Sequence, residues 1–202
     1  MTDITNPVTA RPDFAAIAAW VKPGARVLDL GCGDGSLLRY LRDARNACGY
    51  GVEIDDANIL ACFTNGVNVI QSDLESGLSG FESGSFDYVI LSQTLQAMKH
   101  TEGIVKEMLR VGKEGIVSFP NFGYWQNRLQ IMLGRMPVSE ALPYQWFDTP
   151  NIHLCTLGDF EAFCHQHGAH ILERRVMSGD RPVTFAPNLL GMLVFYRFEQ
   201  LK

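Results

Sequence analysis

Short apolar runs rich in β-branched and aromatic residues alternate with amphipathic runs along most of the chain. Residues typical of strands occupy 25–30, 50–54, 67–71, 86–92, 114–120, 170–177 and 188–199. Apolar positions at helical spacing predict helices at 13–21, 35–44, 55–65, 101–111 and 155–168. Strands that alternate with helices form a parallel sheet covered by helices. We therefore predict an α/β fold with seven strands, the last two of which form an antiparallel hairpin.

One segment, residues 121–154, does not fit this alternation. It contains three prolines and seven aromatic residues when His153 is counted. Long irregular segments are uncommon in compact domains unless they have a function, so we expect a lid, a partner-binding surface or both. Within it, residues 124–133 predict a helix with Trp125, Leu129 and Met132 on one side. Such a stripe either packs into the core or contacts a partner.

Composition adds limits to this picture. A chain of 202 residues with 47% hydrophobic residues has the size and core of a single domain, 1–202, whose first residues, 1–12, we expect to be flexible. The net charge of −5 argues against a nucleic-acid-binding surface. No uncharged apolar run approaches the ~20 residues of a membrane span, and the start lacks a secretion signal. The expected location is cytoplasmic.

The cysteines and histidines predict no metal site. The five cysteines are odd in number and include no C-x-x-C pair, which is typical of reduced, packed thiols. The stretch CHQHGAH, residues 164–170, is the most tempting exception. Its Cys and His residues do not share one helical face, so we interpret it as a helix end stopped by Gly168.

The stretch VLDLGCGDGS, residues 27–36, carries the clearest chemical signal. It places three glycines between a strand and a helix, where open α/β sheets bind their ligands. A dinucleotide site requires G-x-G-x-x-G, but the third position is Ser36 or Leu38, so that motif fails. The pattern present is D-x-G-x-G-x-G, which starts at Asp29.

This pattern resembles the first motif of class I S-adenosylmethionine-dependent methyltransferases. The resemblance implies a Rossmann-like fold: a seven-stranded, mostly parallel sheet with an antiparallel last strand and helices on both faces. The implied cofactor is S-adenosylmethionine or S-adenosylhomocysteine. S-adenosylmethionine has an ammonium, a carboxylate, a sulfonium and an adenosine but no phosphate.

The resemblance also assigns roles to residues at the strand ends. Asp29 suits the cationic amino-acid end, Glu53 accepts from the ribose hydroxyls, Asp73 accepts from the adenine amine, and Ser92 faces the methionine part. Two of these have simpler interpretations, because Asp73 could belong to a turn and Ser92 to packing. Cys32 fits as a small filler rather than a nucleophile. The complete set of implied cofactor-binding residues is Asp29, Gly31, Cys32, Gly33, Glu53, Ile54, Asp73, Leu74 and Ser92.

Catalytic residues are harder to predict. Methyl transfer from a sulfonium depends mainly on positioning, and a base is needed only when the nucleophile is protonated. The N-P-P-Y and P-C motifs of nucleic-acid methyltransferases are missing. Asp148 and His153, which lie among aromatic residues, are weak candidates for a general base. Alternatively, they only hold the turns of their segment in place.

Across the chain, the sequence is similar to the methionine biosynthesis protein MetW family. The similarity runs from about Arg26 onward and includes RVLDLGCGDGSLLRYL, GVEID, QSDLESGL, FDYVILSQTLQA, EGIVSFPNFGYWQNRLQ and FDTPNIHLCTLGDF. It implies a partner, the MetX-type homoserine O-acyltransferase of methionine synthesis. Two hypotheses follow. The chain is either an accessory or regulatory subunit of that enzyme, or an active methyltransferase on a small molecule.

Overall fold

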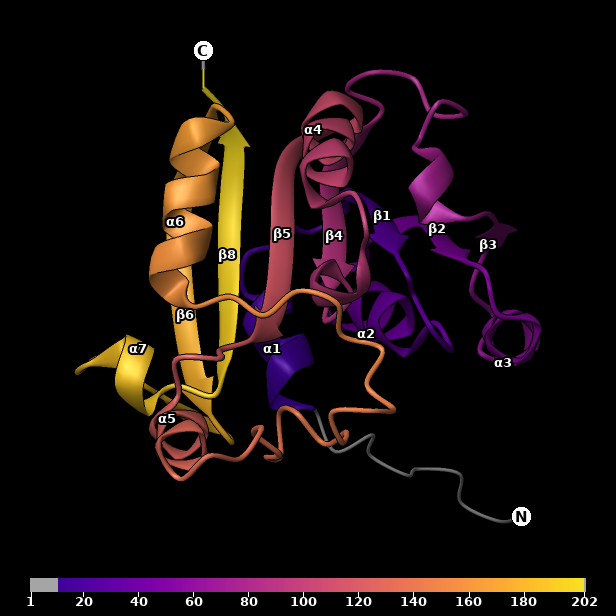
Figure 1. Ribbon diagram of the computed structural model, residues 1–202. Helices are drawn as coiled ribbons and strands as arrows, with labels where there is room; N and C mark the ends of the chain where they lie inside the picture. The colour runs from indigo at the N-terminus through magenta and orange to yellow at the C-terminus, as the bar shows by residue number, and fades with distance from the viewer. Residues whose placement is uncertain (1–10, 202) are drawn as a thin grey trace, which may run out of the picture.

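The computed structural model describes residues 11–201 of the chain (Figure 1). The expected flexibility of residues 1–12 concerns mainly residues 1–10, which lie outside the described residues. The helices are α1 (Pro12–Ala18), α2 (Ser36–Arg45), α3 (Asp56–Thr64), α4 (Thr101–Val111), α5 (Trp125–Met132), α6 (Leu157–Gln166) and α7 (Pro187–Leu190), with the 3-10 helices η1 (Leu74–Ser76) and η2 (Leu95–Ala97). The strands are β1 (Arg26–Leu30), β2 (Cys48–Glu53), β3 (Val69–Gln71), β4 (Phe86–Ser92), β5 (Gly112–Pro120), β6 (Ala169–Ser178), β7 (Arg181–Pro182) and β8 (Leu193–Gln200).

All eight strands form one sheet, in the order β3-β2-β1-β4-β5-β8-β6-β7. Strands β1 to β5 are parallel to one another. Strand β8 lies between β5 and β6 and is antiparallel to both. The mostly parallel sheet with an antiparallel last strand is thus confirmed. The strand order reverses between β1 and β4, and such a switch point is where ligands bind in open α/β sheets.

Two details of the prediction were wrong. The sheet has eight strands rather than seven, because Arg181 and Pro182 form a two-residue edge strand that pairs with the end of β6. The strand predicted at 188–199 begins only at Leu193, because Pro187–Leu190 forms the helix α7 instead. Proline at the first helical position favours a helix start, and Gly191 follows the helix end. The last two long strands are therefore separated by a short helix.

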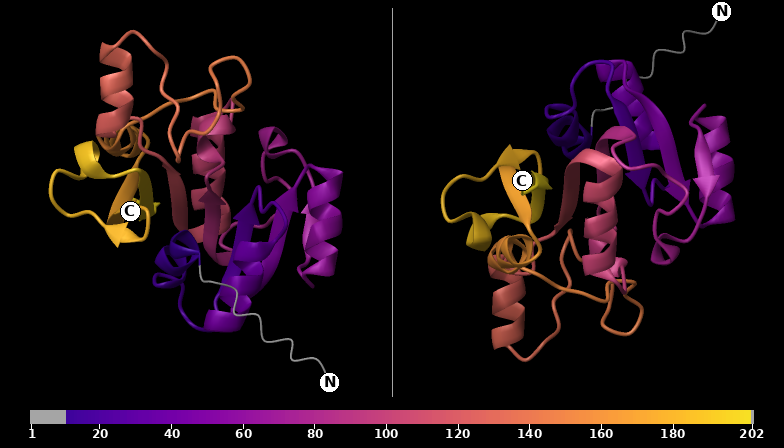
Figure 2. Two further views of the ribbon diagram at one scale, coloured as in Figure 1. Left: turned by 90° about the horizontal axis from the view of Figure 1, so that it is seen from below. Right: turned by 90° about the horizontal axis from the view of Figure 1, so that it is seen from above.

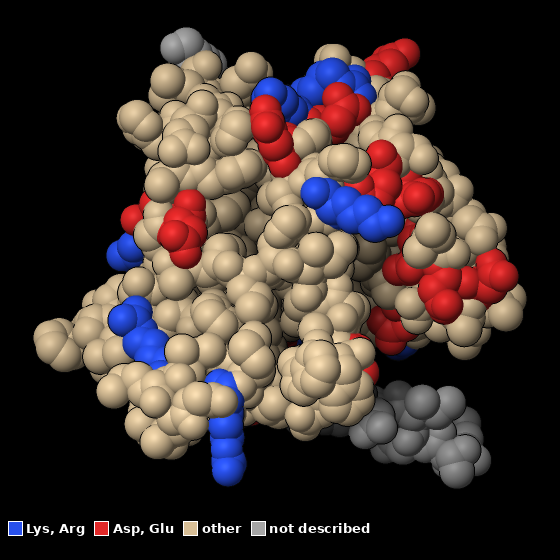
Figure 3. All heavy atoms as spheres, viewed as in Figure 1, with Lys and Arg blue, Asp and Glu red and all other residues tan. Residues whose placement is uncertain are grey.

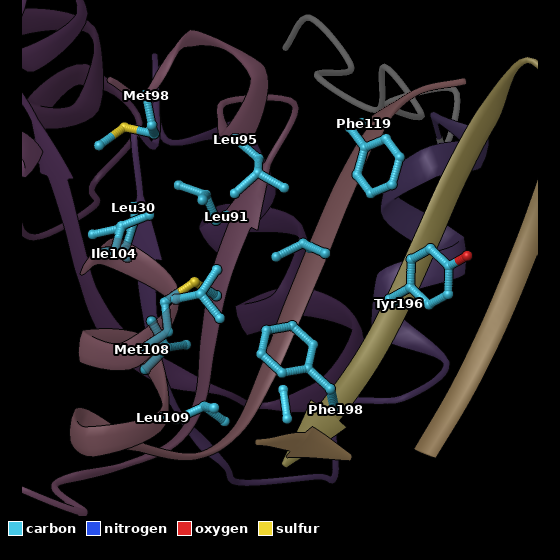
Figure 4. Close-up of a cluster of buried hydrophobic side chains, with 14 of the residues drawn as sticks. Leu30, Leu91, Leu95, Met98, Ile104, Met108, Leu109, Phe119, Tyr196 and Phe198 are labelled. Atoms are coloured by element: carbon cyan, nitrogen blue, oxygen red, sulfur yellow. The ribbon is translucent and has the colours of Figure 1, made fainter. Parts of the chain in front are cut away.

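The sheet has a hydrophobic core on each face, as predicted. One core packs α4 and α6 against the sheet and includes Met108, Tyr196 and Phe198 (Figure 4). The other packs α1 and α2 and includes Ile17 and Leu41. Figure 2 shows these two helix pairs on opposite sides of the sheet. Since helices cover both faces, the carboxyl edge of the parallel strands remains as the place for a ligand.

Helix ends follow local signals in the sequence. The Asp55 side chain accepts a hydrogen bond from the Asn58 amide and caps α3. Thr156 and Asp159 form a complete capping box at the start of α6. That helix ends before Gly168, whose φ of +70° confirms the predicted stop.

Within residues 11–201, no three or more His, Cys, Asp or Glu side chains are grouped so that they could hold a metal ion. All five cysteines are free. None of the helices in this range has both the length and the apolar character needed to cross a membrane.

Candidate functional site

The bend after β1 is built on a glycine whose backbone conformation and close neighbours disfavour any side chain. Gly31 has a φ of +66°, and its amide donates to the Val52 carbonyl at 2.8 Å, which joins the bend to β2. A Cβ at this position would lie 2.9 Å from two atoms of the Thr94 side chain. Thr94 follows β4, so the bend is clamped between the ends of two strands.

Gly33 has a different environment. Its φ is +55°, and a Cβ placed on it would meet nothing within 4 Å. The backbone of Gly33 therefore faces open space at the carboxyl edge of the sheet. A flat ligand can approach the main chain closely at this point.

Glu53, at the end of β2, is held close to this bend. One carboxylate oxygen accepts from the Gly33 amide at 2.8 Å, and the other accepts from the amides of Ile54 and Asp55 at 2.9 and 3.0 Å. An ionised carboxylate has about four acceptor positions, so three are in use. Ile54 follows directly with a side chain that is 60% exposed. The bend is thus bordered by a fixed carboxylate and an exposed apolar side chain.

Asp29 lies beneath the bend on β1 and is 2% exposed. Its Oδ1 atom accepts no hydrogen bond from any described residue. Burial raises the pKa of Asp29 from 3.8 to about 8, and the nearby charge of Glu53 adds to the effect. A buried acceptor without a partner costs stability, so it is characteristic of a site where a ligand supplies the missing group.

Because the pKa of Asp29 is raised, we expect the effect of Asp29→Asn on the free energy of unfolding to depend on pH. The folded state holds the Asp29 proton more tightly than the unfolded state does, so the stability from this group is complete below pH ~4 and is lost as the pH rises toward 8. Each unit of pKa shift corresponds to about 1.4 kcal/mol. We expect the variant to gain at least ~2 kcal/mol relative to the parent between pH 4 and pH 9, measured by urea unfolding.

Asp180→Asn, at an exposed position, provides the control for the loss of a carboxylate that is not buried. If the stability curves of the Asp29 variant and its parent ran parallel with pH, the carboxyl group would not carry the raised pKa.

The other predicted cofactor residues lie near the same edge, with contacts of their own. Asp73 caps η1 by accepting from the Glu75 amide at 2.9 Å, and Leu74 follows within that turn. The Ser92 hydroxyl is 3.0 Å from the hydroxyl of Ser118. The simpler roles considered for Asp73 and Ser92 are therefore both seen, and they leave a role in ligand binding open.

Cys32 is buried between β1 and α2, and its sulfur is 3.8 Å from the sulfur of Cys62. Burial raises its thiol pKa well above the usual range. A thiol with a raised pKa is a poor nucleophile. The observed packing is that of the predicted filler.

The structure does not pair the two candidate base residues. Asp148 and His153 are both exposed, and no hydrogen bond or ion pair between their side chains occurs in residues 11–201. The His153 and Ile152 amides both donate to the Gln96 carbonyl, at 2.9 and 2.8 Å. His153 lines a cavity beside η2, whereas Asp148 does not. The idea that these residues hold turns in place fits the backbone contacts better.

The sequence did not predict that residues 93–94, which follow β4, pack against the bend after β1. Gln93 has a φ of +52°, and its amide is anchored to the Ser118 carbonyl at 2.8 Å. Thr94 then packs on Gly31. A positive φ at a non-glycine residue carries no pattern that could have predicted it, so this contact was visible only in the structure.

The fold has counterparts among solved structures. The chain has the Rossmann-like fold of class I S-adenosylmethionine-dependent methyltransferases. It is similar to such an enzyme from Mesorhizobium loti, with a TM-score of 0.70 at 15% identity, covering 94% of this chain and 98% of that one. A putative methyltransferase complexed with the activator Trm112 in Haloferax volcanii gives a TM-score of 0.67 at 15% identity, covering 95% and 91%.

Sequence comparison gives the family. The model of the methionine biosynthesis protein MetW family matches residues 11–198, and the chain belongs to this family. A bifunctional methionine biosynthesis protein MetXA/MetW of Rhodopirellula baltica is 39% identical over 166 residues, which are 77% of this chain and 27% of that protein. The sterol 24-C-methyltransferase erg6 of Schizosaccharomyces pombe is 30% identical over 108 residues, covering 50% and 29%. The aligned regions span little more than a quarter of these relatives.

Proposed function

We propose that the chain binds S-adenosylmethionine or S-adenosylhomocysteine and acts as an accessory subunit of a homoserine O-acyltransferase of the MetX type. The observation that carries the proposal is the combination, in one chain, of an open glycine bend after β1 and a set of exposed apolar side chains on and after α5. The first feature fits the cofactor, and the second fits a protein partner. Each is argued below from its own contacts.

We use the name nucleoside cleft for the open side of the bend after β1 and the strand ends beside it, where we propose that the nucleoside binds. The open space over Gly33 leaves room for the adenosine, and the Glu53 carboxylate beside it has one acceptor position left for a ribose hydroxyl. The exposed Ile54 side chain gives the adenine ring an apolar contact. The unpartnered, buried Asp29 suits the nearby positive charge of the amino-acid end. When bound, S-adenosylmethionine would supply a methyl group on a sulfonium, whereas S-adenosylhomocysteine has no methyl group to transfer.

The partner surface is formed by α5 and the residues that follow it. We call it the apolar face and define it by the exposed side chains of Trp125, Leu129, Met132, Leu133, Met136, Tyr144, Trp146 and Phe147. Met132 is 82% exposed and Trp146 is 72% exposed. In Figure 3, the lower part of the molecule, where α5 lies in Figure 1, consists mostly of uncharged side chains.

An apolar surface of this extent favours a binding role. Monomeric proteins rarely expose contiguous apolar patches larger than a few hundred Å². Aromatic residues and methionine are the side chains enriched in protein interfaces. The predicted stripe on 124–133 faces solvent rather than the core, since only Asn127 of α5 is buried. This supports the contact interpretation of residues 121–154.

The relative from Rhodopirellula baltica supports the choice of partner. Its name joins a MetW part to a MetXA part in one polypeptide. Proteins that act together are often found fused, because a linker keeps both parts at high effective concentration. We therefore infer that the apolar face binds a MetX-type acyltransferase in the present chain.

Purification of the tagged full chain from the cells that make it tests the proposal. Mass spectrometry of the co-purified proteins should detect the homoserine O-acyltransferase. The small molecules released on denaturation should include an adenosyl compound. Finding neither would contradict the proposal. Transfer of a labelled methyl group from S-adenosylmethionine to a small molecule, by the chain without a partner, would instead support an active methyltransferase.

A further inference from the structure

A cavity of about 770 Å³ opens between α4 and α6, on the sheet face opposite α1 and α2. In Figure 1, the chain that leads into α6 crosses in front of β5, and residues 153–155 of this crossing line the cavity. The nucleoside cleft does not contribute to it, since Gly31, Gly33 and Glu53 are not among its lining residues. The function proposed above therefore leaves this cavity unassigned.

The segment 93–97 separates the two places. Thr94 packs on Gly31 at the cleft, while Leu95 and Gln96 line the cavity. Because one short segment forms a wall of each, the cavity is a neighbour of the cleft and not its extension.

The floor of the cavity is aromatic. Phe119, at the end of β5, and Phe160, on α6, have ring centroids 5.1 Å apart, and Phe163 lies next to Phe160 at 6.2 Å. Leu95 and Leu142 add aliphatic surface. A cavity of several hundred Å³ with such a lining is typical of sites that take the apolar body of a small molecule.

The mouth of the cavity carries two lysines, Lys99 and Lys106, and two carboxylates, Glu102 and Asp159. Glu102 is 2.6 Å from the Lys106 ammonium, and Asp159 caps α6 by accepting from the Thr156 amide and hydroxyl at 2.9 and 2.8 Å. The Lys99 ammonium takes part in no ion pair within residues 11–201. An anionic group on the ligand would therefore meet an unpaired cation at the opening.

We propose that this cavity is a second ligand site, which binds a small carboxylate with an apolar tail or ring. The apolar part lies on Phe119, Phe160 and Phe163, and the carboxylate lies at Lys99. This inference does not depend on the partner or on the nucleoside, and it holds for the isolated chain.

Octanoate and its neutral isostere octanamide are suitable probes for the mouth. Isothermal titration calorimetry on the full chain should show that octanoate binds at least tenfold more tightly than octanamide. Lys99→Gln should remove this preference and leave octanamide binding unchanged. The exposed Lys22 provides the matched control, and Lys22→Gln should keep the preference. Equal affinities for the two probes in the parent protein would overturn the proposal.

The space itself is tested by Gly103→Leu, with Gly158→Leu as control. Gly103, in the first turn of α4, lines the cavity, and a Cβ there meets only the His100 Cβ at 3.9 Å. Gly158, in the first turn of α6, has equally free space but lies outside the cavity. Both variants should fold, because leucine is the better helix former. Octanoate binding should weaken at least tenfold in the first variant only, and unchanged binding there would contradict the site.

Discussion

Gly33→Ala is expected to weaken binding of S-adenosylhomocysteine at least a hundredfold while the chain stays folded. At a φ of +55°, alanine costs roughly 1–2 kcal/mol of conformational strain, and its Cβ clashes with no protein atom. The same Cβ occupies the open space in which the nucleoside must lie. The effect therefore falls on binding, which calorimetry measures, more than on the melting temperature.

Gly179→Ala is the control that separates the backbone strain of alanine at a positive φ from steric obstruction of the ligand. Gly179 has a φ of +60° and free space around its Cβ position, but it lies in the turn between β6 and β7. The Gly179 variant should lose as much stability as the Gly33 variant but bind S-adenosylhomocysteine with the affinity of the parent. If both variants bound the ligand as the parent does, the bend after β1 would not be the nucleoside site.

The second large effect is expected at the apolar face. The double variant Trp146→Ala, Phe147→Ala should weaken binding to the acyltransferase by at least ~30-fold, because a buried aromatic anchor at an interface contributes about 2 kcal/mol or more. The two side chains are 72% and 70% exposed in the isolated chain. Their removal should therefore leave its melting temperature and its nucleoside affinity unchanged.

Phe63, on α3, is the matched control for that variant, since it is 64% exposed and lies outside the apolar face. Phe63→Ala should bind the acyltransferase as the parent does in surface plasmon resonance. An equal loss in both variants would point to a general effect of surface hydrophobicity. If neither variant lost affinity for the acyltransferase, the partner would have to bind another part of the molecule.

Much of the fold could be predicted because buried parallel strands and amphipathic helices have distinct patterns. The helix at 101–111 was predicted with its observed ends, since its apolar positions recur at helical spacing. The strand predicted from residue 188 was misplaced, because a short apolar run such as Asn188–Leu190 fits a helix and a strand equally well. Strand β7 was not predicted, because two residues are too few to show the alternation of polar and apolar positions that is typical of a strand.

The candidate site was predictable only in part. The order of Asp29, Glu53 and Asp73 at successive strand ends placed them at one edge, because parallel strands end on the same side of a sheet. The sequence could not reveal that three amides hold Glu53 or that burial changes the pKa of Asp29. Distances between residues of an irregular segment, such as Asp148 and His153, follow from no spacing rule.

The position of β8 has a consequence for how the molecule is made. This strand comes last in the sequence, yet it lies between β5 and β6 and pairs with both. During synthesis on the ribosome, β5 therefore presents an open edge until β8 has emerged, and β6 has only the two-residue β7 to pair with. Such late, long-range pairing slows folding and favours aggregation of incomplete chains. Nascent polypeptides that stop before residue 193 should therefore depend most on chaperones.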